Sequence, residues 1–323
     1  MDKTLILKNE DNDFEKYISD NMRTDCIEVY SPYKKTGQVL HYIRAICKRL
    51  HIHMLIGIWL NNWKYKLDEY KTIIIFDNGV SEELLKWIKK EDPLCNLKVW
   101  LWNVPSEKER IFKKYANVYC FDEKYSLEHN LYFIDQFYFK PVKSNKTTVK
   151  YDLSFIGLDK NRYKIIEDIA FYLNRYNRKF YFYIVDEKIT KERNYRQAKS
   201  MFIVRNEKIT YKKVLQIVQE SKAVLEILKK DQEGLTLRAL EAMFYQKKLV
   251  TNNKSISKYE WYNPDNVFIL GVDNMDKLGG FLDSPFVNID KEFLYRHTYK
   301  SWLTAITRDM HADVIGERKN AGN

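Results

Sequence analysis

The chain has 323 residues, of which 45% are hydrophobic and 15% are aromatic, and its formal net charge at pH 7 is +11. This length is sufficient for two domains of ordinary size, and the hydrophobic fraction is typical of a globular protein. The sequence contains neither a G-x-G-x-x-G segment nor a Walker-type glycine-rich loop, which argues against a dinucleotide-dependent enzyme and against a P-loop NTPase.

The positive charge is concentrated in the middle of the chain. Residues 101–250 hold 30 Lys and Arg against 19 Asp and Glu, whereas the flanking segments are nearly neutral. A basic surface attracts sugar diphosphates, anionic lipid head groups or nucleic acid. Most of these lysines nevertheless fit an ordinary solvated surface.

Cysteine usage and hydropathy indicate where the protein works. Cys26, Cys47, Cys95 and Cys120 have no C-x-x-C spacing and are predicted to be reduced thiols. The start of the chain does not resemble a signal peptide. The longest uncharged apolar run, residues 53–60, is far shorter than the ~18–20 residues that a membrane span needs. We therefore expect a cytoplasmic protein, with peripheral contact to the inner face of an anionic membrane as a further option.

Short apolar runs alternate with helical patterns in the first 130 residues. Strands are predicted at residues 4–7, 26–30, 72–76, 97–102 and 118–121, and helices at residues 38–50, 81–90, 106–115 and from residue 122. This alternation predicts a parallel sheet with helices on both faces. Ligands of such sheets bind at the carboxyl ends of strands, which makes candidates of Asp77, Asn78, Asn103 and Asp122. Each is also a typical turn or helix-cap residue.

The loop at residues 31–37, Ser-Pro-Tyr-Lys-Lys-Thr-Gly, follows the second predicted strand. Its polar groups suit an acceptor or a phosphate, and they suit an ordinary connection slightly better.

A polar and basic stretch, residues 140–150, is predicted to be an interdomain linker. Strands are then predicted at residues 151–157, 179–185, 224–228, 248–251 and 267–270, and helices up to about residue 173 and at residues 211–220, 234–245 and 291–307. The chain thus divides into a first domain (1–139), the linker (140–150), a second domain (151–290) and a terminal helix with its tail (291–323).

The predicted helix at residues 234–245 is apolar nearly all round, as a helix packed inside a domain would be. At 100° per residue, its narrow polar stripe consists of Gly234, Arg238, Glu241 and Tyr245. Arg238 and Glu241 are three residues apart, so they are expected either to pair with each other or to face a ligand.

The residues at the start of this helix suit an anion. Backbone N–H groups around Gly234 and Leu235, together with the positive end of the helix dipole, form a phosphate site. Gly234 permits close approach of a ligand, and Thr236 adds a hydroxyl donor. The carboxylates of Glu233 and Glu241 flank this position and suit the hydroxyls of a sugar and a ribose.

These residues carry a resemblance. Glu-Gly-Leu-Thr-Leu-Arg-Ala-Leu-Glu-Ala-Met, followed by Lys-Leu-Val-Thr-Asn-Asn, resembles the E-x7-E donor-site segment of bacterial GT-B glycosyltransferases that build capsule, exopolysaccharide and lipopolysaccharide. In the Gln variant of this segment, the first position falls at Gln232 or Glu233. The resemblance implies two Rossmann-like domains that face each other across a cleft, with a C-terminal helix that crosses back to the first domain. Ile-Ile-Phe-Asp and Trp-Leu-Trp-Asn resemble the acceptor domain of the same group.

A second part of the donor site follows from the same resemblance. In the family, a strand that ends in glycine precedes a basic residue that contacts the donor diphosphate, and Gly157 and Arg162 match these places, with Lys160 nearby. Arginine in the first turn of a helix is unfavourable for the helix dipole, which indicates an anion close by. A solvent-exposed arginine is the other interpretation.

The resemblance implies a hexosyltransferase that moves a sugar from a nucleotide sugar, such as a UDP-sugar, to a saccharide acceptor of the lipid-linked surface-polysaccharide kind. No Asp-x-Asp metal motif stands at a strand end, so neither a metal nor another cofactor is expected. Arg162, Arg238 and the amides of residues 234–236 would stabilise the leaving diphosphate. If the reaction inverts, Asp77 is our guess for the general base. No nucleic-acid partner is expected.

Two other functions remain open. A sugar-nucleotide 2-epimerase has the same layout, but it needs several acid and base groups around the sugar, and this chain has few histidines in loops. A non-enzymatic module would grip single-stranded nucleic acid through the basic and aromatic residues of the segment 101–250. Those aromatic residues lie mostly in strand-like apolar runs, which is typical of a core.

Overall fold

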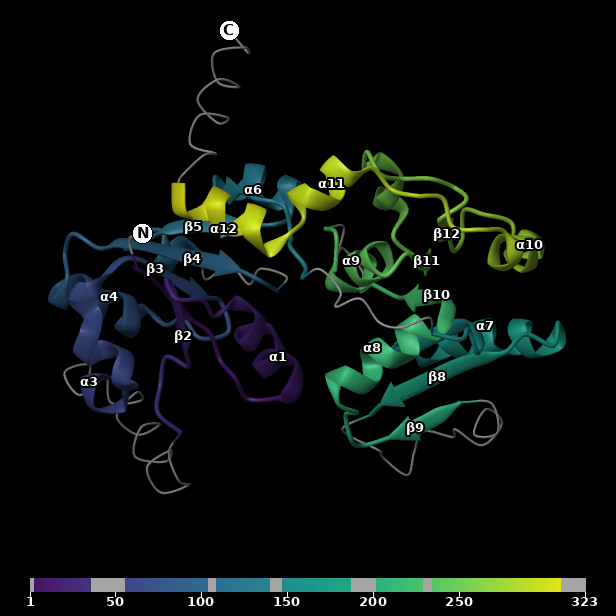
Figure 1. Ribbon diagram of the computed structural model, residues 1–323, viewed down its shortest axis with the longest axis horizontal. Coiled ribbons are helices and arrows are strands. Elements are labelled where there is room, and N and C mark those ends of the chain that lie inside the picture. The colour runs from purple at the N-terminus through teal and green to yellow at the C-terminus, as the bar shows by residue number, and fades with distance from the viewer. Residues whose placement is uncertain are drawn as a thin grey trace, which may run out of the picture. The chain divides into compact units, whose positions relative to one another are not determined.

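The computed structural model describes residues 3–35, 56–103, 109–139, 147–186, 202–228 and 234–308. The chain divides into two compact units, residues 1–135 together with 303–323, and residues 136–302. Each unit is built on one six-stranded sheet, with helices between the strands (Figure 1). The predicted α/β class with two Rossmann-like domains is therefore confirmed.

The sheet of the first domain has the strand order β2-β1-β3-β4-β5-β6, and all of its pairs are parallel. Its strands are β1 (Lys3–Leu7), β2 (Ile27–Tyr30), β3 (Tyr70–Phe76), β4 (Asn96–Leu101), β5 (Asn117–Cys120) and β6 (Tyr132–Phe133). The helices described between them are α1 (Asp13–Met22), α3 (Ile56–Trp59), η2 (Asn62–Glu69), α4 (Glu82–Glu91), α5 (Glu109–Phe112) and α6 (Glu123–His129). The helix predicted at residues 38–50 lies outside the described residues. The sequence did not predict α1 or β6, the latter because two residues are too few to show a period.

Strand β3 lies at the centre of the first domain's core and is buried on both faces. Ile73, Ile74 and Ile75 are fully buried, although successive side chains point to opposite faces of a sheet. Both faces must therefore be covered, as in parallel sheets generally. Side chains fix where the flanking helices begin: Ser81 caps α4 by accepting from Leu84 N at 3.2 Å, as predicted.

The sheet of the second domain has the order β12-β11-β10-β7-β8-β9, also all parallel. Its strands are β7 (Tyr151–Leu158), β8 (Phe180–Val185), β9 (Ile203–Arg205), β10 (Ser221–Glu226), β11 (Lys248–Thr251) and β12 (Val267–Ile269). Its helices include α7 (Tyr163–Arg175), α8 (Tyr211–Gln219), α9 (Leu237–Phe244) and α10 (Leu278–Asp283). Counted from β7, this is the 3-2-1-4-5-6 order of the Rossmann fold, and its switch point lies between β7 and β10.

The end of the chain differs from the single helix predicted at residues 291–307. It forms α11 (Lys291–Arg296) and α12 (Tyr299–Arg308), because backbone groups between them pair with another segment. Tyr138 N donates to His297 O at 2.8 Å, and Tyr299 N donates to Tyr138 O at 3.1 Å. The second half of α12 belongs to the first domain, where Lys98 Nζ donates to Ile306 O at 2.5 Å. The C-terminal helix thus returns to the first domain.

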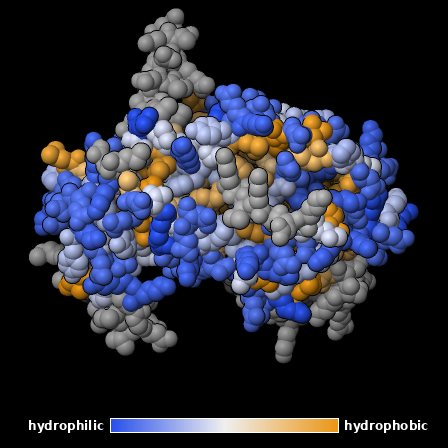
Figure 2. Space-filling view, viewed as in Figure 1, coloured by the Kyte–Doolittle hydropathy of each residue, from blue (hydrophilic) through white to orange (hydrophobic). Residues whose placement is uncertain are grey.

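Surface and thiol properties follow the composition. Within the described ranges, no helix has the length and apolar character that crossing a membrane requires. Figure 2 shows a mostly hydrophilic face on which hydrophobic residues form separate patches.

Cys95 and Cys120 are buried free thiols, and burial raises the pKa of Cys120 to about 11. Cys26 is a half-buried free thiol, and Cys47 lies outside the described residues.

The buried β3 strand gives a stability prediction. Replacing Ile74→Ala removes a fully buried side chain and leaves a cavity, so the free energy of unfolding is expected to fall by about 2–5 kcal/mol in urea denaturation. Ile58→Ala is the matched control, because Ile58 is 59% exposed in the same domain and its loss should change stability by less than about 0.5 kcal/mol. Equal losses in the two variants would contradict the position of the core.

Candidate functional site

Arg162 links the two strands at the switch point of the second domain. It lies at the N-cap of α7, just beyond the carboxyl end of β7. Its guanidinium donates from Nη2 to Leu158 O and from Nη1 to Ile227 O, both at 2.5 Å, and from Nε to Asp159 O at 3.2 Å. Leu158 ends β7 and Ile227 follows β10, so one side chain spans the position where such folds bind ligands.

The charge of Arg162 has no carboxylate partner within the ranges that the structure describes. All three of its acceptors are backbone carbonyls, and a guanidinium carries five N–H donors, so two donors remain. Burial and the neighbouring charge of Arg238 lower the pKa of Arg162. Two cations at one corner repel each other, and a bound anion would relieve that repulsion. The arrangement is compatible with the anion site that the sequence predicts, which stays a prediction.

Arg238 and Glu241 form an ion pair, which is one of the two alternatives predicted from the sequence. Arg238 Nη1 contacts Glu241 Oε2, and Arg238 Nη2 donates to Ile156 O at 2.9 Å. Glu241 is only 3% exposed, and its other oxygen accepts from the Tyr211 hydroxyl at 2.5 Å. The carboxylate is therefore held on both sides, with lone pairs remaining on each oxygen.

Helix α9 begins at Leu237, three residues later than the predicted start at Gly234. Thr236 is the N-cap, and its Oγ1 accepts from Arg238 N at 3.2 Å and from Ala239 N at 3.3 Å. Its hydroxyl proton goes to Glu226, so this hydroxyl does not serve as the donor to a phosphate that the sequence predicted. Gly234 and Leu235 are buried beside it. Glu233 lies outside the described residues.

Glu226 is a member of this corner that the sequence analysis missed. It is 4% exposed at the end of β10 and accepts hydrogen bonds from Thr236 and from Thr251 Oγ1, the latter at 2.6 Å. Burial raises its pKa, whereas the two hydroxyls and the charges of Arg238 and Arg162 act in the opposite direction. In the sequence, its role was signalled by a single carboxylate within the apolar run predicted as a strand at residues 224–228.

Gly157 lies near the end of β7, beside Phe155 and the guanidinium of Arg162. A Cβ at this position would lie 3.5 Å from Arg162 Nη2 and 3.2 Å from Phe155 Cζ. The guanidinium lies 5.5 Å from the centroid of the Phe155 ring, within the range of a cation–π contact. Lys160 is exposed and has a positive φ of 44°.

In the first domain, the structure brings together three of the four predicted cleft candidates. Asp77 follows β3, and its Oδ2 accepts from Asn103 N at 3.0 Å while its Oδ1 accepts from Asn103 Nδ2 at 3.1 Å. Asn78 O accepts from Asn9 Nδ2 at 2.8 Å. Asp122 instead caps α6 by accepting from Tyr125 N at 3.0 Å, which is the structural role considered for it.

Burial shifts the pKa of two ionisable groups at this edge of the sheet. It raises the pKa of Asp77, against the hydrogen bonds from Asn103, and a higher pKa makes a carboxylate a stronger base. Lys8, at the end of β1, is fully buried against the carboxylate of Glu15, and burial lowers its pKa to about 7. The sequence did not single out Lys8, because its burial follows only from the neighbours of β1.

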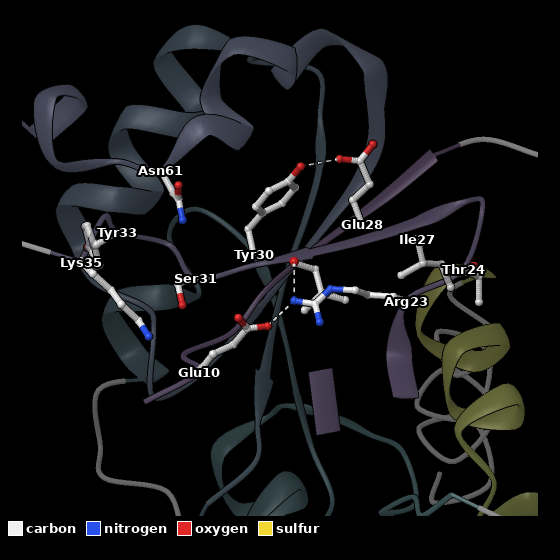
Figure 3. Close-up of a pocket in the computed structure, with 11 residues that line it drawn as sticks. Glu10, Arg23, Thr24, Ile27, Glu28, Tyr30, Ser31, Tyr33, Lys35 and Asn61 are labelled. Atoms are coloured by element: carbon white, nitrogen blue, oxygen red, sulfur yellow. Dashed lines mark hydrogen bonds and ion pairs between the residues drawn. The ribbon is translucent and has the colours of Figure 1, made fainter. Parts of the chain in front are cut away.

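A pocket of about 520 Å³ lies along β2, the edge strand of the first sheet (Figure 3). Ser31, Tyr33 and Lys35 line it, and all three belong to the polar loop predicted at residues 31–37. Figure 3 shows Arg23 held by Glu10 at the wall of this pocket. Three side chains of this loop thus line a space of small-molecule size, and its role in binding an acceptor or a phosphate stays a prediction.

No protein-family model matches this sequence, and no sequence among the curated proteins matches it. Among solved structures, the chain is similar to AviGT4, a glycosyltransferase involved in avilamycin A biosynthesis. The TM-score is 0.54 at 11% identity, over 93% of this chain and 92% of that one. It is also similar to an alpha-glucosyltransferase in complex with UDP and a 13-mer DNA, with a TM-score of 0.53 at 11% identity over 96% and 98%.

The chain spans about half the length of TarM, covering 54% of that chain with 77% of its own, at 14% identity and a TM-score of 0.45. AviGT4 and the alpha-glucosyltransferase match nearly their whole length, and thus both sheets of this chain. The protein therefore has the two-domain GT-B fold of these glycosyltransferases.

The position of Gly157 beside Phe155 gives a prediction. Gly157→Ala is expected to lower the free energy of unfolding by about 1–3 kcal/mol, because the new methyl group crowds the Phe155 ring. Gly280→Ala is the control: its Cβ would meet nothing within 4 Å in α10, so the variant should be up to about 1 kcal/mol more stable. Chemical denaturation measures both, and the same sign for the two variants would disprove the crowding.

Proposed function

We propose that this protein is a glycosyltransferase that takes a sugar from a nucleoside diphosphate sugar, such as a UDP-sugar. The observation that carries the proposal is the presence of two guanidinium groups, Arg162 and Arg238, at the switch point of the second domain. A diphosphate is the ligand that matches two arginines at such a position. The GT-B fold supports the reaction class, although fold alone does not assign activity.

In this proposal, different side chains bind different parts of the sugar-nucleotide donor. Arg162, Arg238 and the backbone around residues 234–236 face the diphosphate, while Glu241 accepts from the ribose hydroxyls and Glu233 from those of the sugar. The bond between the sugar C1 and the β-phosphate oxygen breaks, and its electron pair stays on the diphosphate. The acceptor oxygen bonds to C1 and loses its proton. The two guanidinium groups stabilise the leaving charge without requiring a metal.

Asp77 is our candidate for the base that takes the acceptor proton if the reaction inverts configuration. Burial raises its pKa, and Asn103 holds its carboxylate in place. We propose a saccharide acceptor, of the lipid-linked surface-polysaccharide kind that the donor segment resembles. The pocket along β2, with its hydroxyl and amine groups from Ser31, Tyr33 and Lys35, suits such a ligand.

Nucleotide binding provides the direct test. A thermal-shift screen of nucleoside diphosphates is expected to show a raised melting midpoint for one base, with UDP as our first choice, because a ligand that binds only the folded state stabilises it. In Glu241→Gln the affinity for that nucleotide should fall about tenfold or more, since a charge-assisted hydrogen bond to the ribose becomes a neutral one.

Glu109→Gln is the matched control for this screen. Glu109 is a carboxylate of 1% exposure that pairs with His129 at 3.1 Å in the first domain, so its neutralisation should leave nucleotide affinity unchanged. Unaltered affinity in Glu241→Gln would remove Glu241 from the site. If no nucleoside diphosphate binds the wild-type protein, the transferase proposal fails.

DNA is a second candidate acceptor. The alpha-glucosyltransferase with bound UDP and DNA matches 96% of this chain, and the net charge of +11 favours a polyanion. If DNA is the acceptor, binding to a short duplex should weaken by orders of magnitude between about 50 and 200 mM salt. Fluorescence anisotropy measures this slope, and a duplex that does not bind even at the lower salt concentration would leave the saccharide acceptor.

A further inference from the structure

Two buried tyrosine hydroxyls form a chain of hydrogen bonds that ends at Glu241. Tyr211 Oη donates to Glu241 Oε1 at 2.5 Å, and Tyr138 Oη lies 2.7 Å from Tyr211 Oη. A phenol has one proton, and Tyr211 gives its proton to Glu241, so Tyr138 is the donor in the second bond. The three residues are 1–6% exposed, which shields these hydrogen bonds from water.

Tyr138 joins the two segments that connect the domains. It lies three residues after the boundary between Asp135 and Gln136, and its backbone is bonded to His297 and Tyr299, which precede the second boundary at residues 302 and 303. Gln136 O also lies 2.8 Å from His297 Nδ1. Both connecting segments are therefore hydrogen-bonded to each other where the hydroxyl chain begins.

The neighbouring helix adds a second contact to this arrangement. The ring of Tyr138 packs against Phe244 of α9, with centroids 5.7 Å apart, and α9 is the helix that carries Arg238 and Glu241. Burial and the charge of Glu241 raise the pKa of Tyr211 well above its usual value. The hydroxyl thus remains a donor across the physiological pH range.

We propose that Tyr138 and Tyr211 are positioning residues of the nucleotide site, which orient Glu241 for the ribose and couple its occupancy to the two interdomain segments. The inference rests on the proposed function, because it assigns the ribose to Glu241. A carboxylate has about four lone-pair sites, and Tyr211 and Arg238 use two of them. A ribose hydroxyl shares the same oxygens, so binding changes the strength of the tyrosine bonds. By linkage, the Tyr138 bond changes the free energy of nucleotide binding by the same amount as nucleotide binding changes the free energy of that bond.

Removing the hydroxyl that reaches Glu241 through Tyr211 tests this coupling. In Tyr138→Phe, which leaves Arg162, Arg238 and Glu241 in place, UDP is expected to bind about three- to tenfold more weakly in isothermal titration calorimetry. Because the hydroxyls act in series, Tyr138→Phe should add nothing in a Tyr211→Phe background. If the two substitutions weaken UDP binding by factors that multiply, the two tyrosines have independent packing roles and the proposal is overturned. Wild-type affinity in Tyr138→Phe would overturn it as well.

Tyr70→Phe is the matched control. The Tyr70 hydroxyl is also buried and donates to a carboxylate, Glu28, at 2.9 Å, but it belongs to the first domain. Its loss should leave UDP affinity unchanged, and a loss as large as that of Tyr138→Phe would mean that any buried tyrosine gives the effect.

Amide hydrogen exchange separates failure of this coupling from failure of the transferase proposal. The amides of Tyr138 and Tyr299 form the bonds between the connecting segments, so they should exchange faster in Tyr211→Phe than in the wild-type protein without any ligand. Unchanged exchange at these amides overturns the link to the segments, whether or not UDP binds. If the wild-type protein binds no nucleoside diphosphate, the proposed function fails, and the nucleotide role of the tyrosines fails with it.

Discussion

The guanidinium of Arg162 is the interaction on which the candidate site depends. It fastens the carboxyl end of β7 to the chain that follows β10 by donating to a backbone carbonyl of each. A buried carbonyl needs a hydrogen-bond donor, and a buried guanidinium needs acceptors. The guanidinium and the carbonyls therefore satisfy each other. Within the described residues no carboxylate is bonded to this guanidinium, although the charge of Glu226 acts on it from nearby, at the position where a doubly wound sheet receives its ligand. Stability of the switch point and attraction for an anion thus have one source.

The second arginine is held differently, and the difference bears on function. Arg238 has a carboxylate partner, Glu241, whose position is set in turn by Tyr211. Glu226, beneath both arginines, is held by two threonine hydroxyls. The corner therefore contains more acidic groups than a phosphate requires. Carboxylates fixed by hydrogen bonds suit neutral hydroxyl groups, which fits a sugar nucleotide better than a simple phosphate.

The fold leaves open which reaction these groups perform. AviGT4, involved in avilamycin A biosynthesis, and the alpha-glucosyltransferase, in complex with UDP and DNA, share the fold with this chain at 11% identity. One architecture serves different acceptors because the sheets provide only the positions at strand ends, while the side chains there select the ligand. In this chain the second domain supplies the cationic corner, and the first supplies Asp77 and a pocket along β2.

The sequence by itself determined the class of fold, most strand positions and the caps at Ser81 and Asp122, because hydrophobic periodicity and cap residues act over a few neighbours. It also indicated Gly157, Arg162 and the pairing of Arg238 with Glu241. Only the tertiary structure showed that Thr236 gives its proton to Glu226, that Tyr138 reaches Tyr211, and that the last helix breaks at His297. Those partners are 10 to 161 residues apart in the chain, and no local pattern records which distant groups burial brings together.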